Sequence, residues 1–311
     1  MGKVANGPKP QTAWLRWRQF TMSKLDFVDT HVHFYDMQHP DLHYAHWQPD
    51  VDPPMIGKQM RKLGERNFVA EDFIALTLNA NVTKAVHVQA AIGSRDPVTE
   101  TEWLQEAADR TGFPHGIVAY ADLRDPAVEE VLARHCEFPN MRGIRDFSHG
   151  DYLVEPDFDR GFTLLEKYEL RSSVAVQWHD MEKLRALADK HPNIPIVVDH
   201  AGVPAERSDE YFERWKQGIA IAARAENIVM KVSGLGMGDH NWTVASIRPY
   251  VLHCIEAFGV ERTIFATNWP VDSLFSDYDA VVDAYTEIVA DFTLGGQEAM
   301  FSKNAEALYR I

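Results

Sequence analysis

The stretch Phe27-Val28-Asp29-Thr30-His31-Val32-His33-Phe34 is typical of a buried β-strand, because β-branched and aromatic residues dominate it. Side chains alternate across a strand, so His31 and His33 are expected on one side, with Asp29 behind them. Burying two neighbouring imidazoles is unfavourable unless a polar partner such as a metal ion or a substrate binds them. The alternative is a pair of structural histidines satisfied by backbone groups, and the rest of the chain decides between the two.

The length and hydropathy of the chain favour one large domain. The 311 residues are 45% hydrophobic, enough for a substantial core, and α/β barrels commonly reach this size as a single domain. No apolar run approaches the roughly 18 residues of a membrane span. We therefore expect no membrane association.

The charge balance and the cysteines restrict the partners and the compartment. The net charge is −15, from 31 basic and 46 acidic residues, which argues against a nucleic acid as the main partner. The two cysteines, Cys136 and Cys254, fall in helical patterns and indicate a reducing, cytoplasmic setting. The sequence is compatible with a homo-oligomer and does not specify one.

Residues 1–25 differ in composition from the rest of the chain. They contain no acidic residue, several lysines and arginines, and no continuous apolar core or cleavage site of a signal peptide. We expect a basic N-terminal arm or extension over 1–25, followed by a single domain over 26–311.

After the first strand, a long connection over about 35–67 is broken by prolines, and strands and helices then alternate. The expected strands are 27–34, 84–91, 116–123, 141–147, 172–178, 194–202, 228–235 and 263–270. The expected helices are 97–112, 126–137, 156–170, 181–191, 209–225, 242–258 and 277–291, with an extra C-terminal helix over 296–309.

Eight short apolar strands, each followed by a helical pattern, indicate parallel strands with right-handed crossovers. Eight such units close a barrel, so the predicted fold is α/β, a (β/α)8 TIM barrel with a long loop after the first strand. An open doubly wound sheet is the rival, and the absence of a glycine-rich phosphate-binding turn after the first strand counts against it.

Polar side chains stand where nearly every expected strand ends. In a barrel of this type the active site lies at the C-terminal ends of the strands, so these residues are expected to face one another. They are His31, His33, His87, Gln89, Asp122, Arg124, Arg145, Asp146, Gln177, His179, Asp199, His200, Ser233 and Asn268. The long loop adds Tyr44 to the residues expected to bind substrate, and its other aromatic residues and histidines suggest an ordered loop.

Three motifs together carry a family resemblance. DTHVHF at the first strand, VDHAG at the sixth and FATNWPVD at the eighth resemble the amidohydrolase-related (amidohydrolase 2) family, and more narrowly its lactonase-like branch of sugar-lactone and pyrone-dicarboxylate lactonases. The resemblance covers about residues 26–311. It implies a distorted (β/α)8 barrel, binding roles for His31, His33 and His200, and hydrolysis of a C–O or C–N bond.

One residue departs from the family pattern. Where the wider family has an aspartate at the end of the eighth strand, this chain has Asn268, which cannot accept a proton at working pH. The role of general base therefore does not carry over to residue 268, and Asp272 is the nearby candidate for it.

The cofactor is either absent or one divalent metal, with zinc the first choice. His31, His33 and His200 could form an open three-histidine zinc site that activates a water. The lactonase-like branch resembles enzymes that work without a metal. The missing carboxylate of the eighth strand favours that second interpretation.

We therefore expect a hydrolase that opens a carboxylate-bearing lactone of a sugar acid or of an intermediate of aromatic degradation. The expected catalytic residues are His31, His33, His200, Asn268 and Asp272, and the expected substrate-binding residues are Arg145, Arg124, His87, Gln89, Gln177 and Tyr44. Arginine suits the task because its planar guanidinium binds a carboxylate through two hydrogen bonds. The alternatives are a metal-dependent decarboxylase or hydratase of an aromatic or unsaturated acid, and a catalytically inactive small-molecule-binding barrel.

Overall fold

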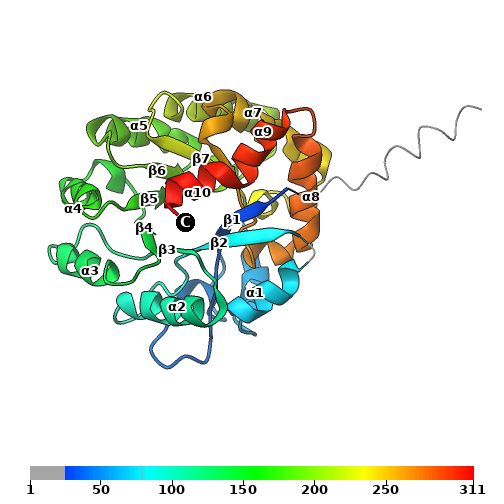
Figure 1. Cartoon of the computed structure of the whole chain (residues 1–311). Coiled ribbons are helices and arrows are strands. Elements are labelled where there is room, and N and C mark those ends of the chain that lie inside the picture. Colours follow the sequence, from blue (N-terminus) through cyan, green and yellow to red (C-terminus); the bar gives the residue numbers. More distant parts are fainter. Residues whose placement is uncertain (1–24, 79) are drawn as a thin grey trace, which may run out of the picture.

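The computed structural model describes residues 25–78 and 80–311, so the expected basic arm lies almost entirely outside the described residues. Eight parallel strands form one sheet in the order β1-β2-β3-β4-β5-β6-β7-β8. Figure 1 looks along the barrel, with the helices arranged around it. This is the (β/α)8 barrel that the alternation of elements predicts.

All eight expected strands are present, and each is shorter than expected. Their bounds are β1 Phe27–Val32, β2 Val82–Val88, β3 Gly116–Ala119, β4 Met141–Ile144, β5 Arg171–Val174, β6 Ile196–Val198, β7 Ile228–Val232 and β8 Thr263–Phe265. The barrel closes between β8 and β1 through one bridge, Val32 with Trp269, and through the His33 N–H, which donates to the Trp269 carbonyl at 2.8 Å.

The helices follow the strands as expected, with two differences. Their bounds are α1 Ala70–Thr77, α2 Val98–Thr111, α3 Val128–His135, α4 Pro156–Lys167, α5 Met181–Lys190, α6 Asp209–Ala222, α7 Val244–Phe258, α8 Tyr278–Ile288, α9 Leu294–Glu298 and α10 Asn304–Tyr309. Helix α1 was absent from the expected elements. The expected C-terminal helix over 296–309 consists of α9, a π-helical turn and α10.

Helix α10 lies across the N-terminal end of the barrel (Figure 1), where it contacts the starts of several strands. Lys84 at the start of β2 pairs with Glu306 at 2.6 Å, and Arg171 at the start of β5 donates to the Leu308 carbonyl. Tyr309, fully buried, joins a separate apolar cluster with side chains of five strands. The cluster comprises Val28, Val86, Val88, Val118, Val197, Ile264, Ala305 and Tyr309.

The long loop between β1 and α1 is packed against the C-terminal end of the barrel. The ring of Tyr44 stacks on Trp47 at 5.3 Å, and both residues are buried. Tyr35 and Phe68 form a bridge that joins the two ends of the loop. The loop is thus an ordered cover, as its aromatic content predicts.

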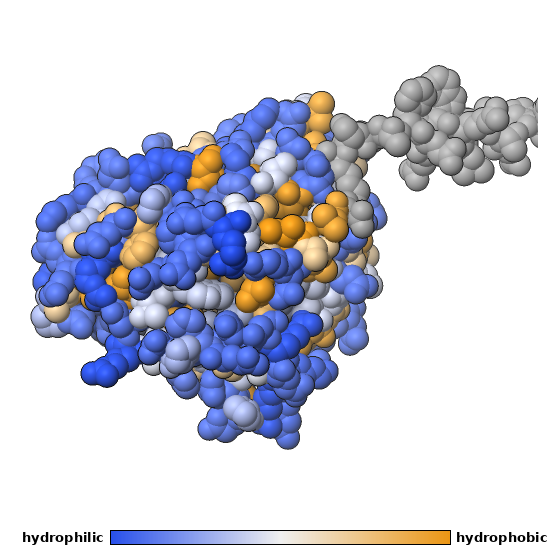
Figure 2. All heavy atoms as spheres, turned by 60° about the horizontal axis from the view of Figure 1, so that its bottom comes forward, coloured by the Kyte–Doolittle hydropathy of each residue, from blue (hydrophilic) through white to orange (hydrophobic). Residues whose placement is uncertain are grey.

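The surface carries no large apolar face in the view of Figure 2, where hydrophobic residues appear in small groups among hydrophilic ones. Within the described residues, no helix combines the length and the apolar character that crossing a bilayer requires.

We expect Tyr309→Ala to destabilise the protein by about 3–5 kcal/mol, because it empties the space of a fully buried aromatic ring in the cluster inside the barrel. Urea unfolding followed by circular dichroism measures the change. The neighbouring Arg310→Ala is the control, since it removes an exposed ion pair with Glu169, which contributes at most about 1 kcal/mol, and a hydrogen bond to the Glu169 carbonyl, but no buried ring. Equal losses in the two variants would contradict the proposed packing.

Candidate functional site

Two histidines, His31 and His33, lie at the C-terminal end of the first strand, at the mouth of the barrel. His31 is fully buried and His33 is 6% exposed, and their ring centroids are 4.9 Å apart. The pairing of β1 with β2 is irregular between Asp29 and Val32. Despite this irregularity, the two imidazole rings lie next to each other, as the alternation of side chains predicts.

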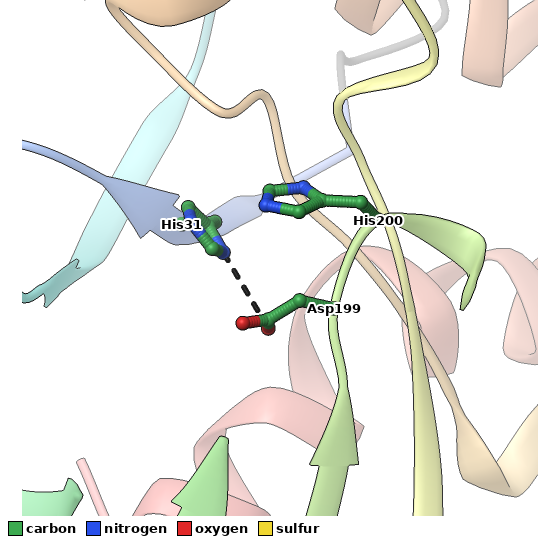
Figure 3. A group of neighbouring side chains, drawn as sticks. All are labelled: His31, Asp199 and His200. Carbon is green, nitrogen blue, oxygen red and sulfur yellow. Dashed lines mark ion pairs between the residues drawn. The ribbon is translucent and has the colours of Figure 1, made fainter. Parts of the chain in front are cut away.

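Asp199 and His200 directly follow the sixth strand and meet His31 across the barrel (Figure 3). The rings of His31 and His200 have centroids 4.4 Å apart, and Asp199 Oδ1 lies 3.5 Å from His31 Nδ1. His200 adopts a left-handed backbone with φ of 54° and its Nδ1 lies 2.9 Å from Ser233 Oγ, at the end of β7. Strands β1, β6 and β7 therefore position this group.

The Asp199 carboxylate is surrounded by polar groups. Ser173 Oγ donates to Oδ2 at 2.7 Å, Arg145 Nε lies 3.2 Å from Oδ2, and Lys231 Nζ lies 3.1 Å from Oδ1. Burial opposes the charge of Asp199, but the positive charges around it, led by Lys231, hold its pKa well below the ordinary value. Asp199 is therefore an anion in the folded protein.

The three histidines are neutral at physiological pH. Burial lowers the pKa of His33 to about 3, assisted by Arg145, and burial also lowers the pKa of His200 to about 3. Burial, followed by the proximity of His200, lowers the pKa of His31 well below its ordinary value. With two cations facing one carboxylate and neutral imidazoles, the site has a surplus of one positive charge.

The neighbours of the histidines also determine which ring nitrogen carries the proton. His33 Nδ1 lies 2.9 Å from the Val88 carbonyl, which accepts only, so Nδ1 carries the hydrogen and Nε2 presents a lone pair. The carboxylate beside His31 Nδ1 favours the same tautomer. These imidazoles therefore offer proton acceptors to the site.

Asn268 and Asp272 form a second buried pair at the end of β8. Asn268 has a left-handed backbone with φ of 61°, and its Nδ2 donates to Asp272 Oδ2 at 2.7 Å. Burial raises the pKa of Asp272 to about 7, although the hydrogen bond from Asn268 lowers it in part. The carboxyl group thus fixes the amide of Asn268, with Nδ2 toward Asp272 and Oδ1 as the remaining acceptor.

Asp29 connects the first and the last strand below the histidines. It accepts hydrogen bonds from the Thr267 N–H at 3.0 Å, the Thr267 hydroxyl at 2.6 Å and the Tyr278 hydroxyl at 2.9 Å. Burial raises the pKa of Asp29 to about 6, while the bonds from Thr267 oppose the rise. This carboxyl group stabilises the seam between β1 and β8.

Arg145 extends from the Asp199 group toward the loops above it. Its guanidinium lies 5.0 Å from the centroid of the Phe147 ring, which in turn contacts the His46 ring at 4.7 Å. His46 comes from the loop after β1, so this loop and the loop after β4 meet beside the site. His46 Nε2 and Trp47 Nε1 are buried and have no hydrogen-bond partner among the described residues.

The other residues expected to bind substrate lie in varied surroundings. Tyr44 is buried among aromatic rings, and its hydroxyl accepts the Asp36 N–H at 3.0 Å. His87 Nδ1 accepts the Phe34 N–H at 3.1 Å, and Nε2 lies 3.4 Å from Glu100. Gln89 is buried with its Oε1 unpartnered in the described part of the chain, which leaves it available to a ligand.

Two further expected residues lie apart from the buried group. Gln177 is half-buried before the short turn Trp178–Asp180, with no side-chain hydrogen bond to another described residue. Arg124 is partly exposed and pairs with Asp122 at 3.4 Å and Glu155 at 3.7 Å. Their substrate-binding roles remain predictions.

Lys231 is the site residue that sequence reasoning missed. It lies within β7, is fully buried, and touches Asp199, which the sequence placed at a strand end without a role. The available signal was a single lysine within an apolar strand, since a buried lysine requires a counter-charge.

The only group of potential metal ligands that the described residues bring together is His31, Asp199 and His200, whose ligand atoms lie within 4.8 Å of one another. Asp199 takes the place in which we expected His33. Both oxygens of Asp199 already face cations, Lys231 at Oδ1 and Arg145 at Oδ2. A divalent ion at this carboxylate would compete with two buried positive charges, so the residues present do not fit a tightly bound metal.

The chain matches the amidohydrolase family over residues 28–311, and it belongs to this family of hydrolases.

Individual relatives extend the comparison. The uncharacterised protein y4mH of Sinorhizobium fredii is 39% identical, and the match covers 93% of this chain and 100% of that protein. An L-fucono-1,5-lactonase of Burkholderia ambifaria is 28% identical over 91% of this chain and 95% of its own. The crystal structure of an amidohydrolase from Burkholderia multivorans with bound zinc has a TM-score of 0.79 at 25% identity, covering 92% of this chain and 99% of that one.

We expect Asp272→Asn to change the pH dependence of stability. The pKa of Asp272 is raised from 3.8 to about 7, so the folded protein keeps a proton that the unfolded chain has lost, and wild type loses stability as the pH rises through this interval. The variant lacks this loss, so its free energy of unfolding relative to wild type increases between pH 5 and pH 8 by on the order of 2 kcal/mol. Urea unfolding at the two pH values measures it.

The matched control is Asp279→Asn, which makes the same chemical change at an exposed position on α8. A pH dependence of Asp272→Asn that parallels the control would contradict a buried, protonated Asp272.

Proposed function

We propose that the protein opens a small carboxylate-bearing lactone, from a sugar acid or from the degradation of an aromatic compound, by attack of water on the ring carbonyl. The observation that carries the proposal is His31: its Nε2 is buried, has no partner among the described residues, and belongs to a neutral imidazole beside Asp199. Two L-fucono-1,5-lactonases, each 28% identical and covering 91% and 82% of this chain, support the choice of a lactone.

In this proposal His31 is the general base. Its Nε2 accepts a proton from the attacking water, and the Asp199 anion stabilises the imidazolium that forms. The imidazolium then returns the proton to the ring oxygen as the bond between this oxygen and the carbonyl carbon breaks, which opens the ring and restores neutral His31. His33 presents an acceptor to the substrate hydroxyls or to the same water. Because His31 and His33 offer lone pairs, we assign them to the water and the hydroxyls rather than to polarisation of the carbonyl.

Arg145 supplies the positive charge that the substrate requires. The surplus charge of Arg145 and Lys231 over Asp199 favours an anionic ligand and stabilises the oxyanion that develops as water attacks. Of the two cations, Arg145 reaches the loops of the mouth, where it lies over Phe147. We therefore assign the substrate carboxylate to Arg145.

Asn268 orients the substrate in this scheme. Its Nδ2 is held by Asp272, so its Oδ1 accepts a hydrogen bond from a substrate hydroxyl or from water. Asp272 is fully enclosed, and we assign it to holding Asn268 rather than to proton transfer.

A panel of sugar-acid and pyrone lactones, with and without a free carboxylate, tests the activity through proton release in a weakly buffered solution. We expect hydrolysis of carboxylate-bearing lactones, with higher kcat/KM than for their uncharged counterparts. Release of carbon dioxide from a hydroxylated aromatic acid, without lactone opening, would instead identify the decarboxylase alternative. Binding of a lactone without turnover would identify the inactive binding barrel.

Substitutions of Asn268 test the assignment of the base. Asn268→Ala is expected to lower kcat/KM by about 1–3 kcal/mol, the range for a buried partner left unpaired. Asn268→Asp places a second carboxyl group against Asp272 and near an anionic substrate, so it should not increase activity. His31→Ala should lower kcat/KM considerably more than Asn268→Ala. An inactive wild type with an active Asn268→Asp would overturn the proposal.

A further inference from the structure

Lys231 is a buried cation that the proposed chemistry uses only through its charge. It lies on β7, is 0% exposed, and its Nζ is 3.1 Å from Asp199 Oδ1 and 5.8 Å from the centroid of the Tyr309 ring. Removing an ammonium group from water is costly, and an ion pair with a carboxylate offsets the cost. The structure thus places a fixed positive charge inside the barrel, beneath the histidines.

Among His31, Asp199 and His200, the carboxylate of Asp199 is the anionic ligand that a divalent cation would bind. A divalent cation takes an anionic ligand readily, and Asp199 is the only carboxylate in the group that could hold a metal ion in the described chain. Four side chains already surround its two oxygens: Lys231 and His31 at Oδ1, and Arg145 and Ser173 at Oδ2. Each oxygen of the carboxylate thus already faces a positive charge of the protein itself.

We propose that Lys231 is a positioning residue that takes the place of a divalent cation, holding Asp199 against the barrel and keeping metal ions away from His31 and His200. The ammonium provides positive charge at the carboxylate oxygen that a metal would approach. With Arg145, it leaves the group positive by one charge, and a further two charges at the same place are repelled.

This inference is independent of lactone opening, because it concerns the affinity of the protein for zinc alone. Isothermal titration of chelator-treated full-length protein with zinc measures it directly. We expect Lys231→Met to bind one zinc ion at least tenfold more tightly than wild type, because methionine keeps an unbranched chain of similar length without the charge. Lys84→Met is the matched control, since Lys84 is also a strand lysine in an ion pair, with Glu306 at the opposite end of the barrel.

Two further variants make the result decisive. Arg145→Met removes the other cation from Asp199 and should also tighten zinc binding. It therefore serves as the test variant if Lys231→Met fails to fold. Lys231→Met combined with His200→Ala should lose the gain, which locates the zinc ion in the group of His31, Asp199 and His200. Three results would each overturn the inference. They are equal zinc affinity of wild type and both single variants, tight zinc binding by wild type, and a gain in affinity that survives His200→Ala.

Discussion

The buried carboxylate of Asp199 is the charge around which the site is assembled. It follows β6, and its partners Arg145, Ser173, Lys231 and His31 come from the ends or interiors of β4, β5, β7 and β1. No pair of these elements is brought together by local sequence, so the barrel has to close before the carboxylate can be satisfied. The same contacts that solvate Asp199 thereby fix the relative positions of the histidines.

A second buried carboxyl group, that of Asp29, also joins separate elements of the barrel, but its pKa is raised whereas that of Asp199 is lowered. Neutral donors surround it, namely the backbone and hydroxyl of Thr267 and the hydroxyl of Tyr278, and burial raises its pKa to about 6. Asp199 instead faces two cations and stays ionised. The two aspartates show how the partners of a buried carboxyl group decide whether its pKa rises or falls.

The fold was predictable because its signals are local. Short apolar runs and helical patterns located every strand, whereas α1 escaped because its eight residues bury only Ala70, Phe73 and Thr77, too few for a clear period. Barrel geometry placed His31 and His200 among the polar residues at the strand ends, and the family resemblance singled them out. Lys231 lies in mid-strand between Met230 and Val232, and the carboxylate it faces depends on packing between strands, which no local pattern records. Likewise, only the folded structure shows that Asp272 fixes the amide of Asn268.

The surplus of cations around Asp199 also restricts how such a site can evolve. Loss of Lys231 or Arg145 alone alters the balance of a buried carboxylate that four side chains share, and loss of Asp199 alone leaves two buried positive charges facing each other. A lineage that loses Asp199 must therefore lose a cation or acquire another negative charge at nearly the same time. Descendants of this barrel are expected to keep or exchange the three residues as a set.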